Sequence, residues 1–302
     1  GFETFSKKHF KVRSMIHRKV LPVVVFLFVI THTGCHQKMF QKPFEETPAL
    51  EANKISQKGV WNGKKSAVVL TYDDALHVHL DHAAPALDSQ GLKATFYLSG
   101  YTDAFQKRLA EWRALAGKGH ELGNHTMFHP CEGGKPEREF VKKDYDLTTY
   151  TVSRMEDEVK MTNTLLSALD GKTERTFAYP CSDTKIGGVS YINNLQPAFS
   201  GARAVRSEIP TIQEVDLYNL PSYMVSGQTG DVLIKEVQKA MAKEGLVVFL
   251  FHGVGGEHGL DVGLDAHRQL LVYLKEHQSQ IWVTTMTEAA TFIKQQQKKV
   301  QH

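Results

Sequence analysis

From Trp61 onward, the apolar residues of this chain fall into short runs that alternate with longer segments of helical spacing. The short runs are continuous and rich in β-branched and aromatic residues, which is typical of strands covered on both faces. These predicted strands are Ala67–Tyr72, Ala94–Leu98, Thr176–Tyr179, Leu246–Phe251 and Ile281–Thr284. The predicted helices cover about 78–90, 104–117, 150–169, 231–243, 265–277 and 287–297. Repeated strand–helix units predict an α/β fold with a parallel sheet or barrel.

The N-terminal residues follow a different pattern. Arg18 and Lys19 precede the apolar run Val20–Ile30, which is too short to cross a bilayer and is typical of a signal peptide. The following Thr33-Gly34-Cys35 resembles a bacterial lipoprotein cleavage box, in which the cysteine is lipidated, although His32 replaces the usual apolar residue. We therefore expect residues 1–35 to be a signal and lipoprotein segment. The protein is expected to be exported and lipid-anchored to the bacterial cell envelope, with simple secretion as the alternative.

A polar stretch, residues 36–60, contains two prolines and no sustained periodicity, so it is predicted to link the anchor to a single domain over 61–297. The formal net charge of +3 comes from the start of the chain, where residues 1–42 hold eight Lys and Arg against the single acid Glu3. The rest of the chain is net acidic. Nucleic acid is therefore not expected as a partner, and membrane contact is expected only through the anchor.

The chain has three cysteines. If Cys35 carries lipid, Cys131 and Cys181 remain as an even pair in an oxidising compartment, where disulfides form. Two unrelated buried thiols are the alternative, and parity alone leaves both possibilities open.

Polar side chains follow several predicted strands at the point where each strand ends. Asp73 and Asp74 come after AVVLTY, Cys181 and Ser182 after TFAYP, and His252 after LVVFLF. Each has a structural explanation, since Asp is favoured in turns and helix N-caps and a histidine at a strand end can simply be hydrogen-bonded. However, side chains for chemistry gather at the carboxyl ends of parallel strands. Their joint occurrence there predicts a functional site.

Residues 119–130 read GHELGNHTMFHP. His120 and Glu121 open the zinc-protease pattern HExxH, but His125 comes one position too late and Gly123 disfavours a helix. His125 and His129 would face the same way if residues 125–129 form one helical turn. Two imidazoles and a carboxylate are a common site for zinc or a similar divalent cation. Three other histidines are predicted to lie on a helix surface or at a pocket rim: His77, His79 and His82.

The segments TYDDA, HTMFH, the YPC stretch and LFH occur in one order across residues 71–252. In that order they resemble the successive motifs of the polysaccharide deacetylase (NodB-homology) family of carbohydrate esterases, over about residues 65–295. The resemblance implies a distorted (β/α) barrel with parallel strands and a single catalytic domain. The implied roles are Asp73 as catalytic base, Asp74, His125 and His129 as metal ligands, Thr126 as a brace of the turn, and His252 as general acid.

The chain departs from the family pattern in its first and third motifs. Ala75 replaces the glycine of the first motif. Ala178 stands where the third motif usually has the arginine that orients the base. Arg203 or Arg206, in GARAVRS, is expected to restore that charge from the next strand.

Two further positions follow from the resemblance. The family's oxyanion donor is the backbone N–H after the motif proline, which here belongs to Cys181. The fourth motif, which supports the acid histidine, has no clear match, and Asp216 is the candidate for it. Because Cys131 and Cys181 each directly follow implied site residues, a disulfide between them is predicted to clamp two site loops. These departures resemble a divergent branch of secreted bacterial deacetylases.

The implied function is metal-dependent removal of N- or O-linked acetyl groups from an acetylated poly- or oligosaccharide. One divalent ion is expected, zinc, with cobalt or nickel as substitutes. Asp73 would take the proton of a water activated by the ion, and His252 would protonate the departing amine or sugar oxygen. The alternative is a carbohydrate-binding lipoprotein on a catalytically decayed deacetylase scaffold, which the missing arginine and the unclear fourth motif favour.

Overall fold

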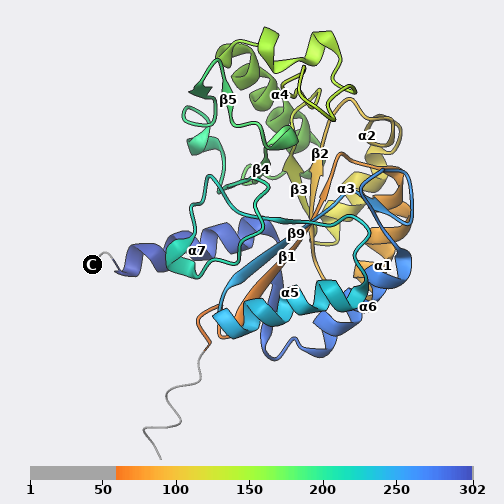
Figure 1. Ribbon diagram of the computed structural model, residues 1–302, viewed down its shortest axis with the longest axis vertical. Helices are drawn as coiled ribbons and strands as arrows, with labels where there is room; N and C mark the ends of the chain where they lie inside the picture. Colours follow the sequence, from red (N-terminus) through yellow and green to blue (C-terminus); the bar gives the residue numbers. More distant parts are fainter. Residues whose placement is uncertain (1–58, 301–302) are drawn as a thin grey trace, which may run out of the picture. The chain divides into compact units, whose positions relative to one another are not determined.

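The computed structural model describes residues 59–300. The expected signal and lipoprotein segment and nearly all of the expected linker lie outside the described residues and stay predictions. Within the described part, parallel strands form a curled sheet with helices packed around it (Figure 1). This arrangement confirms the predicted α/β fold of the distorted barrel type.

Eight strands form the main sheet, in the order β7-β4-β3-β2-β1-β9-β8, with β12 also paired to β1. Their pairings are parallel. The strands are β1 (Ser66–Asp73), β2 (Thr95–Leu98), β3 (Glu121–Asn124), β4 (Phe177–Ala178), β7 (Ala202–Arg203), β8 (Tyr223–Met224), β9 (Leu246–Phe251) and β12 (Ile281–Thr284). Two minor sheets pair β5 (Lys185–Ile186) with β6 (Val189–Ser190) and β10 (Gly253–Val254) with β11 (Asp261–Val262).

Strand β1 is the centre of the sheet and the source of its distortion. Along one edge, residues 67–72 pair with β9. Along the other edge, residues 66–69 pair with β12, whereas residues 71–73 pair with β2. Because β1 changes partners halfway, β12 and β2 diverge around it and the sheet curls instead of lying flat.

The helices cover the sheet as strand–helix crossovers require. Figure 1 shows α5 and α6 side by side along one flank of β1 and β9, and α4 packs beside β3 farther along the sheet. The main helices are α1 (Ala84–Gln90), α3 (Leu109–Gly117), α4 (Val152–Asp170), α5 (Gly230–Lys243), α6 (Leu264–Glu276) and α7 (Met286–Val300). Shorter helices include η1 (His79–Ala83) and α2 (Asp103–Lys107).

The five predicted strands and six predicted helical regions are confirmed, with three differences. The region predicted as one helix over 104–117 is two helices, because the backbone leaves the helical conformation at Arg108 (φ −123°). The helix predicted from residue 78 begins as the π-helical η1 before α1. The sequence did not indicate β3 or β8, which are short, and it indicated β7 only as the strand that carries Arg203 or Arg206.

Side chains of β1 alternate between two cores. Val68, Leu70 and Tyr72 join the largest apolar cluster, with residues of α1, α5 and α6, whereas Ala67 and Val69 join a second cluster around Trp61 and α7. The ring of Tyr72 stacks between two neighbouring strands, with its centroid 4.9 Å from Phe96 and 5.1 Å from Phe251. Since side chains alternate along a strand, Asp73 leaves β1 on the face opposite to Tyr72.

The unexpected strand β3 contains a buried carboxylate, that of Glu121. Its oxygens accept hydrogen bonds from the Thr95 hydroxyl at 2.8 Å, the Thr176 hydroxyl at 2.6 Å and the Thr287 hydroxyl at 2.6 Å. Backbone N–H groups of Thr176 and Thr287 donate to it as well. Because a buried charge must be hydrogen-bonded, this network explains how a polar segment becomes an interior strand.

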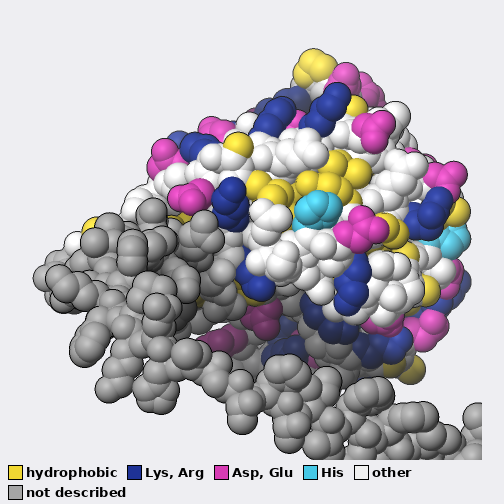
Figure 2. All heavy atoms as spheres, turned by 90° about the horizontal axis from the view of Figure 1, so that it is seen from below, with side chains coloured by type: hydrophobic (Ala, Val, Ile, Leu, Met, Phe, Trp, Pro, Cys, Tyr) yellow, Lys and Arg dark blue, Asp and Glu magenta, His cyan; other side chains and the backbone are white. Residues whose placement is uncertain are grey.

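Charged residues of both signs are interspersed on the face drawn in Figure 2, where hydrophobic side chains gather around a central histidine. Among residues 59–300, no helix is both long enough and apolar enough to cross a bilayer.

Candidate metal and acid–base site

The two adjacent acids lie at the carboxyl end of β1, where the chain turns sharply. Asp73 is the last residue of the strand, and the next two residues have positive φ angles, 82° at Asp74 and 57° at Ala75. Residues other than glycine rarely adopt this backbone conformation, which explains why the family motif has glycine where this chain has Ala75. The turn directs the carboxylates of Asp73 and Asp74 to different partners.

The two histidines after β3 come together without a helix. The expected helical turn over 125–129 is wrong, because the segment is an irregular loop in which Thr126 and His129 have φ angles of 64° and 50°. The loop is closed by the N–H of His129, which donates to the Thr126 hydroxyl at 2.9 Å. This bond confirms the expected brace. The ring centroids of His125 and His129 lie 4.8 Å apart.

Asp74, His125 and His129 converge on one point. Oδ1 of Asp74 lies 3.4 Å from Nε2 of His125 and 3.4 Å from Nε2 of His129. These atoms lie within 4.8 Å of one another, as the ligands of a single cation would. Oδ1 of Asp74 is buried and has no hydrogen-bond partner within residues 59–300. A buried, unpaired carboxylate oxygen facing two imidazole nitrogens fits a divalent cation.

Hydrogen bonding orients His125 for this task. Its Nδ1 lies 2.8 Å from the carbonyl oxygen of Ala178 and therefore donates to it. The proton on Nδ1 leaves the lone pair of Nε2 facing Asp74, which is the arrangement of a metal-binding imidazole.

The charge states of the ligands also fit a cation. Burial alone would raise the pKa of Asp74, but the surrounding His129, His125 and His252 hold it well below its usual range, so the carboxylate is ionised. Burial lowers the pKa of His129 to about 4, so this imidazole is neutral near pH 7. For His125, burial acts in the same direction, but Asp73 and Asp74 outweigh it and raise the pKa. A cation at this point would therefore compete with a proton for His125.

Asp73 has a separate partner, Arg203. Nη2 of Arg203 lies 2.5 Å from Oδ2 of Asp73, and both side chains are buried. Arg203 is the last residue of β7, and its Nη1 donates to the Ser222 hydroxyl at 3.2 Å. Oδ1 of Asp73 is buried and has no hydrogen-bond partner in the described part of the chain. Asp73 therefore keeps one oxygen on the arginine and one free for another group.

Of the two arginines that the sequence left open, the structure brings only Arg203 to the site. Arg206 points away, with its Nε 2.7 Å from Oε1 of Glu208 and its side chain partly exposed. Arg203 thus supplies, from the next strand of the sheet, the positive charge that is missing at Ala178.

His252 follows β9 and faces the same carboxylate. Its Nε2 is 4.0 Å from Oδ2 of Asp74. Burial lowers the pKa of His252, although Asp74 and Asp73 act in the opposite direction. Its Nδ1 is buried and unpaired within residues 59–300. The expected support from Asp216 is wrong, because that side chain is exposed and instead accepts from the N–H of Tyr218 at 2.9 Å.

The support of His252 comes from residues that sequence reasoning placed elsewhere or missed. His79, expected at a surface or rim, is fully buried, and its Nε2 donates to the carbonyl oxygen of His252 at 2.7 Å. The N–H of Leu76 donates to Nδ1 of His79, which leaves the proton on Nε2. His258, which no motif indicated, stacks on the His252 ring with centroids 4.6 Å apart.

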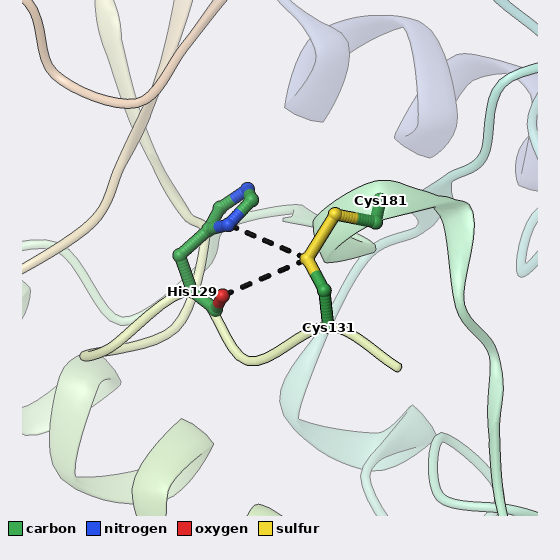
Figure 3. A group of neighbouring side chains, drawn as sticks. All are labelled: His129, Cys131 and Cys181. Carbon is green, nitrogen blue, oxygen red and sulfur yellow. Dashed lines mark hydrogen bonds between the residues drawn. A yellow bond between two sulfur atoms is a disulfide. The ribbon is translucent and has the colours of Figure 1, made fainter. Parts of the chain in front are cut away.

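The predicted disulfide between Cys131 and Cys181 is confirmed (Figure 3). Nδ1 of His129 lies 3.5 Å from the sulfur of Cys131, so the bridge lies directly against a candidate metal ligand. The cysteines themselves are not thiolate ligands, because both sulfurs are used in the bridge. Cys181 adopts a left-handed backbone conformation (φ 52°) at the wall of the cleft.

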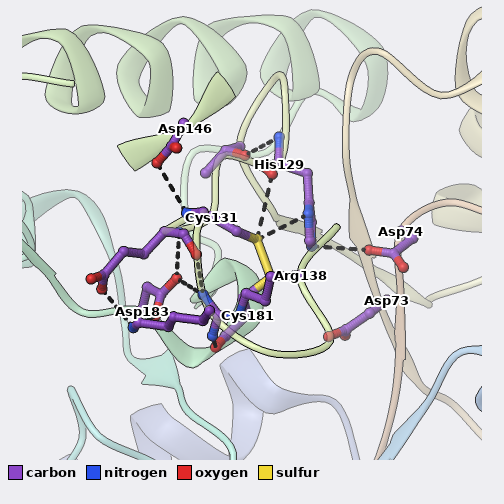
Figure 4. The surroundings of a disulfide bond; sticks show 12 residues. Asp73, Asp74, His129, Cys131, Arg138, Asp146, Cys181 and Asp183 are labelled. Atoms are coloured by element: carbon purple, nitrogen blue, oxygen red, sulfur yellow. Dashed lines mark hydrogen bonds and ion pairs between the residues drawn. A yellow bond between two sulfur atoms is a disulfide. The ribbon is translucent and has the colours of Figure 1, made fainter. Parts of the chain in front are cut away.

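Ionic contacts reinforce the two loops that the disulfide joins (Figure 4). The carboxylate of Asp183 accepts from the N–H of Glu132 at 2.8 Å and pairs with Arg138. Arg138 also donates to the carbonyl oxygen of Cys181 at 3.0 Å. Figure 4 places this clamp next to His129, which points toward Asp74.

These groups line a cleft of about 680 Å³. Asp73, Asp74, His125, His129 and His252 lie in it, and its remaining walls are largely apolar. An aromatic edge, defined by Tyr101, Phe128, Phe140 and Tyr145, borders the cleft beside His129. The rings of Phe128 and Tyr145 stack 5.0 Å apart, and Phe140 is 60% exposed.

Residues 61–194, which hold β1 and the loop with both histidines, match the family model for polysaccharide deacetylase. The chain belongs to the polysaccharide deacetylase (NodB-homology) family. Among relatives of this deacetylase-family protein, the peptidoglycan-N-acetylmuramic acid deacetylase PdaA of Bacillus subtilis is 24% identical over 120 residues, 39% of each chain. A chitin deacetylase of a Pestalotiopsis species is 24% identical over 204 residues, 59% of each chain. The chain thus spans less than two thirds of the length of these two relatives.

The fold of this deacetylase-family protein also matches a crystal structure from Mycobacterium smegmatis that is assigned as a polysaccharide deacetylase. The TM-score is 0.57 at 15% sequence identity, and the match covers 77% of this chain and 91% of the other. At this identity the likeness concerns the fold, and it agrees with the curled parallel sheet described above.

Proposed function

We propose that this protein is a cation-dependent hydrolase that removes acetyl groups from an acetylated carbohydrate. The observation that carries the proposal is the division of labour between neighbouring acids. Oδ1 of Asp74 faces two imidazole nitrogens at 3.4 Å, while Asp73, one residue earlier, pairs with Arg203 and keeps Oδ1 unpaired among the described residues. Acetyl hydrolysis with a divalent cation needs both a ligand set and a separate base.

Asp74, His125 and His129 would hold one divalent ion, for which zinc is our first choice and cobalt or nickel the substitutes. One carboxylate oxygen and two imidazole nitrogens are the donors that zinc accepts in hydrolases. Bound there, such an ion would supply a more acidic water and polarisation of the acetyl carbonyl.

The remaining roles belong to residues around this point. Asp73 accepts the proton of the attacking water through Oδ1, and Arg203 fixes the carboxylate and balances its charge. The backbone N–H of Cys181 stabilises the oxygen that becomes negative at the acetyl carbon. His252 gives a proton to the departing nitrogen or oxygen, since an amine leaves poorly without one.

A carbohydrate substrate agrees with the family and with the cleft. Two of the matching relatives are named as deacetylases, one of peptidoglycan N-acetylmuramic acid and one of chitin. The aromatic edge extends the cleft beyond the candidate metal ligands, which suits a chain of sugar rings better than a single small molecule. For location, we propose an exported protein anchored through lipid at Cys35. Detergent-free release of the Cys35-intact product into the soluble periplasm would count against anchoring.

The experiment is a measurement of acetate release from N-acetylated and O-acetylated glycans, with metal-loaded and metal-stripped protein. The wild type should be active only with metal. Asp73→Asn should keep the metal and the fold and lose about 10²–10⁴-fold in rate. His252→Ala should also keep the metal and should lose more on amides than on esters. Asp216→Asn, at an exposed acid with a local hydrogen bond, is the matched control and should behave as the wild type.

The alternative function is carbohydrate binding on a decayed deacetylase scaffold. The missing third-motif arginine and the unclear fourth motif favoured it. Arg203 beside Asp73 answers the first ground, whereas Asp216 does not answer the second. A binding protein would release no acetate from any glycan in the panel, and its sugar affinity would not respond to Asp73→Asn or His252→Ala. That result, with zinc, cobalt or nickel bound, would replace the hydrolase proposal.

A further inference from the structure

One histidine in the cleft takes no part in the proposed proton transfers, although its ring packs against that of His252. His258 lies in the loop between β10 and β11 and lines the same cleft as the candidate ligands. Its ring stacks on that of His252, with centroids 4.6 Å apart and planes at 13°. Its Nε2 faces Oδ2 of Asp74 at 3.9 Å. The Asp74 carboxylate therefore presents Oδ1 to the candidate ligands and Oδ2 to this stacked pair of histidines.

The loop that carries His258 is held on several sides. Glu257, with φ of 71°, accepts from the N–H groups of His77 at 3.1 Å and Val78 at 2.8 Å. Oδ1 of Asp261 accepts from the N–H of Gly256 at 2.9 Å. The two bonds to Glu257 attach the loop to the turn after β1, and the bond to Asp261 closes the loop on itself, so the position of His258 is fixed relative to Asp74.

A fourth hydrogen bond determines which ring nitrogen of His258 carries the proton. The N–H of Leu260 donates to Nδ1 at 3.0 Å, so Nδ1 must present a lone pair. The neutral ring then carries its proton on Nε2, which points into the cleft. An imidazole with this tautomer cannot bind a cation through Nε2, so His258 differs from His125, whose Nε2 lone pair is free.

Oδ2 of Asp74 is too far from Nε2 of His258 to accept its hydrogen bond, because 3.9 Å exceeds the usual donor–acceptor distance. The His258 side chain is also the outer member of the stacked pair, with 33% of it exposed against 13% for His252. An acetyl group that reaches the candidate ligands would thus leave its sugar beside His258.

We propose that Nε2–H of His258 donates a hydrogen bond to an oxygen of the sugar that carries the acetyl group, which makes His258 a substrate-binding residue. This inference rests on the proposed carbohydrate substrate. It predicts a contribution to the recognition of the sugar and none to metal binding. It also gives the two stacked histidines different roles. His252 would protonate the leaving group, and His258 would bind the sugar that carries the acetyl group.

Two variants test the proposal. His258→Phe keeps a stacking ring without the N–H, and His258→Gln keeps a side-chain N–H of similar reach. On an N-acetylated chito-oligosaccharide and an O-acetylated xylo-oligosaccharide, His258→Phe should raise KM roughly 3- to 10-fold with little change in kcat, as loss of one neutral hydrogen bond implies. His258→Gln should restore most of the loss. On 4-nitrophenyl acetate, which has no sugar, His258→Phe and His258→Gln should have equal rates, and metal content should be unchanged.

Calorimetric binding of the same oligosaccharides separates this inference from the proposed function. Wild-type protein that binds a glycan but releases no acetate would overturn the hydrolase proposal alone, and weaker binding by His258→Phe would still support the sugar contact. Equal KM and equal affinity in His258→Phe and the wild type would overturn the role of His258. Loss of metal from His258→Phe would overturn it as well. So would a loss of kcat/KM on 4-nitrophenyl acetate as large as the loss on the oligosaccharides.

Discussion

The guanidinium of Arg203 contacts the carboxylate of Asp73 at 2.5 Å, although 130 residues separate them in the chain. Arg203 lies on β7, and its guanidinium carbon also lies 5.0 Å from the ring centroid of Tyr97. The arginine that the family motif provides within the third motif is thus replaced from the neighbouring strand. A positive charge therefore faces Asp73, the proposed base, although its usual source, at the position of Ala178, is absent.

Arg203→Met should therefore reduce acetate release by about 10²-fold, because Asp73 loses both its orientation and its balancing charge. Breaking a buried ion pair on one side costs about 3–5 kcal/mol, so the melting temperature should fall as well. The rate of acetate release by Arg203→Lys should lie between those of the wild type and Arg203→Met, since a lysine keeps the charge but lacks the planar guanidinium. Arg206→Met, at a partly exposed arginine outside the site, is the control and should have the acetate release and melting temperature of the wild type. Full activity in folded Arg203→Met would refute the replacement.

The metal prediction concerns the ligand set. Protein purified without chelators should contain about one equivalent of zinc or a similar ion by elemental analysis. The double variant His125→Ala/His129→Ala should lose it, because two of three protein ligands are removed, whereas His77→Ala should keep it. Unchanged metal in a folded double variant would show that the ion binds elsewhere.

The site could be predicted from the sequence only in part. Asp73, Asp74, His125, His129 and His252 converge as the motif order implied, because each follows a strand of one parallel sheet. The choice of Arg203 over Arg206 was not readable, because it depends on where β7 pairs with β4. His79 and His258 were missed because their roles arise from loops that meet only in the folded chain.

The disulfide should stabilise the fold and hold the site loops. Cys131 and Cys181 are 50 residues apart, for which the chain-entropy model gives roughly 4 kcal/mol. The double variant Cys131→Ala/Cys181→Ala should lose about 2–4 kcal/mol in urea unfolding. A reductant should lower the stability of the wild type to a similar extent and leave the double variant unchanged. Two free thiols at these positions in unreduced protein would contradict the bridge.

The aromatic edge should matter for glycan chains and not for small esters. Phe140 is 60% exposed, so Phe140→Ala should not change stability measurably. Loss of one ring contact should raise KM for an acetylated oligosaccharide roughly 2- to 10-fold. The rate on 4-nitrophenyl acetate should stay the same. Val189→Ala, at an exposed apolar residue of β6, is the matched control. Equal KM values on oligosaccharides would exclude this edge from binding.

The fold was more readable than the site, because the long apolar runs of β1 and β9 and the periodic helices carry strong local signals. Strand β3 gave no such signal, since Glu121 is stabilised by threonines from three distant segments. The loop at 125–129 was misread as helical for a related reason. Its shape depends on one hydrogen bond to Thr126 and on two left-handed residues, which the spacing of the histidines does not reveal.

The last prediction concerns pH and stability, through a histidine beneath the site. His267 is buried, and its Nε2 lies 2.7 Å from the hydroxyl of Tyr72. Burial, with a smaller effect from His79, lowers the pKa of His267 to about 4 from 6.5. Between these values the unfolded chain binds a proton that the folded chain does not, so stability is present above pH 6.5 and is lost as the pH falls.

At pH 5 the loss through His267 alone should be about 2 kcal/mol relative to pH 7.5, at 1.36 kcal/mol per pH unit below 6.5. Urea unfolding at both pH values measures it. In His267→Gln the amide oxygen can still accept from the Tyr72 hydroxyl, but the titrating group is gone. The variant should be less stable than the wild type at pH 7.5, because the packing around residue 267 is altered. On acidification it should lose clearly less stability than the wild type, because the titrating imidazole is gone. Parallel losses in the two proteins would show that His267 is not the group responsible.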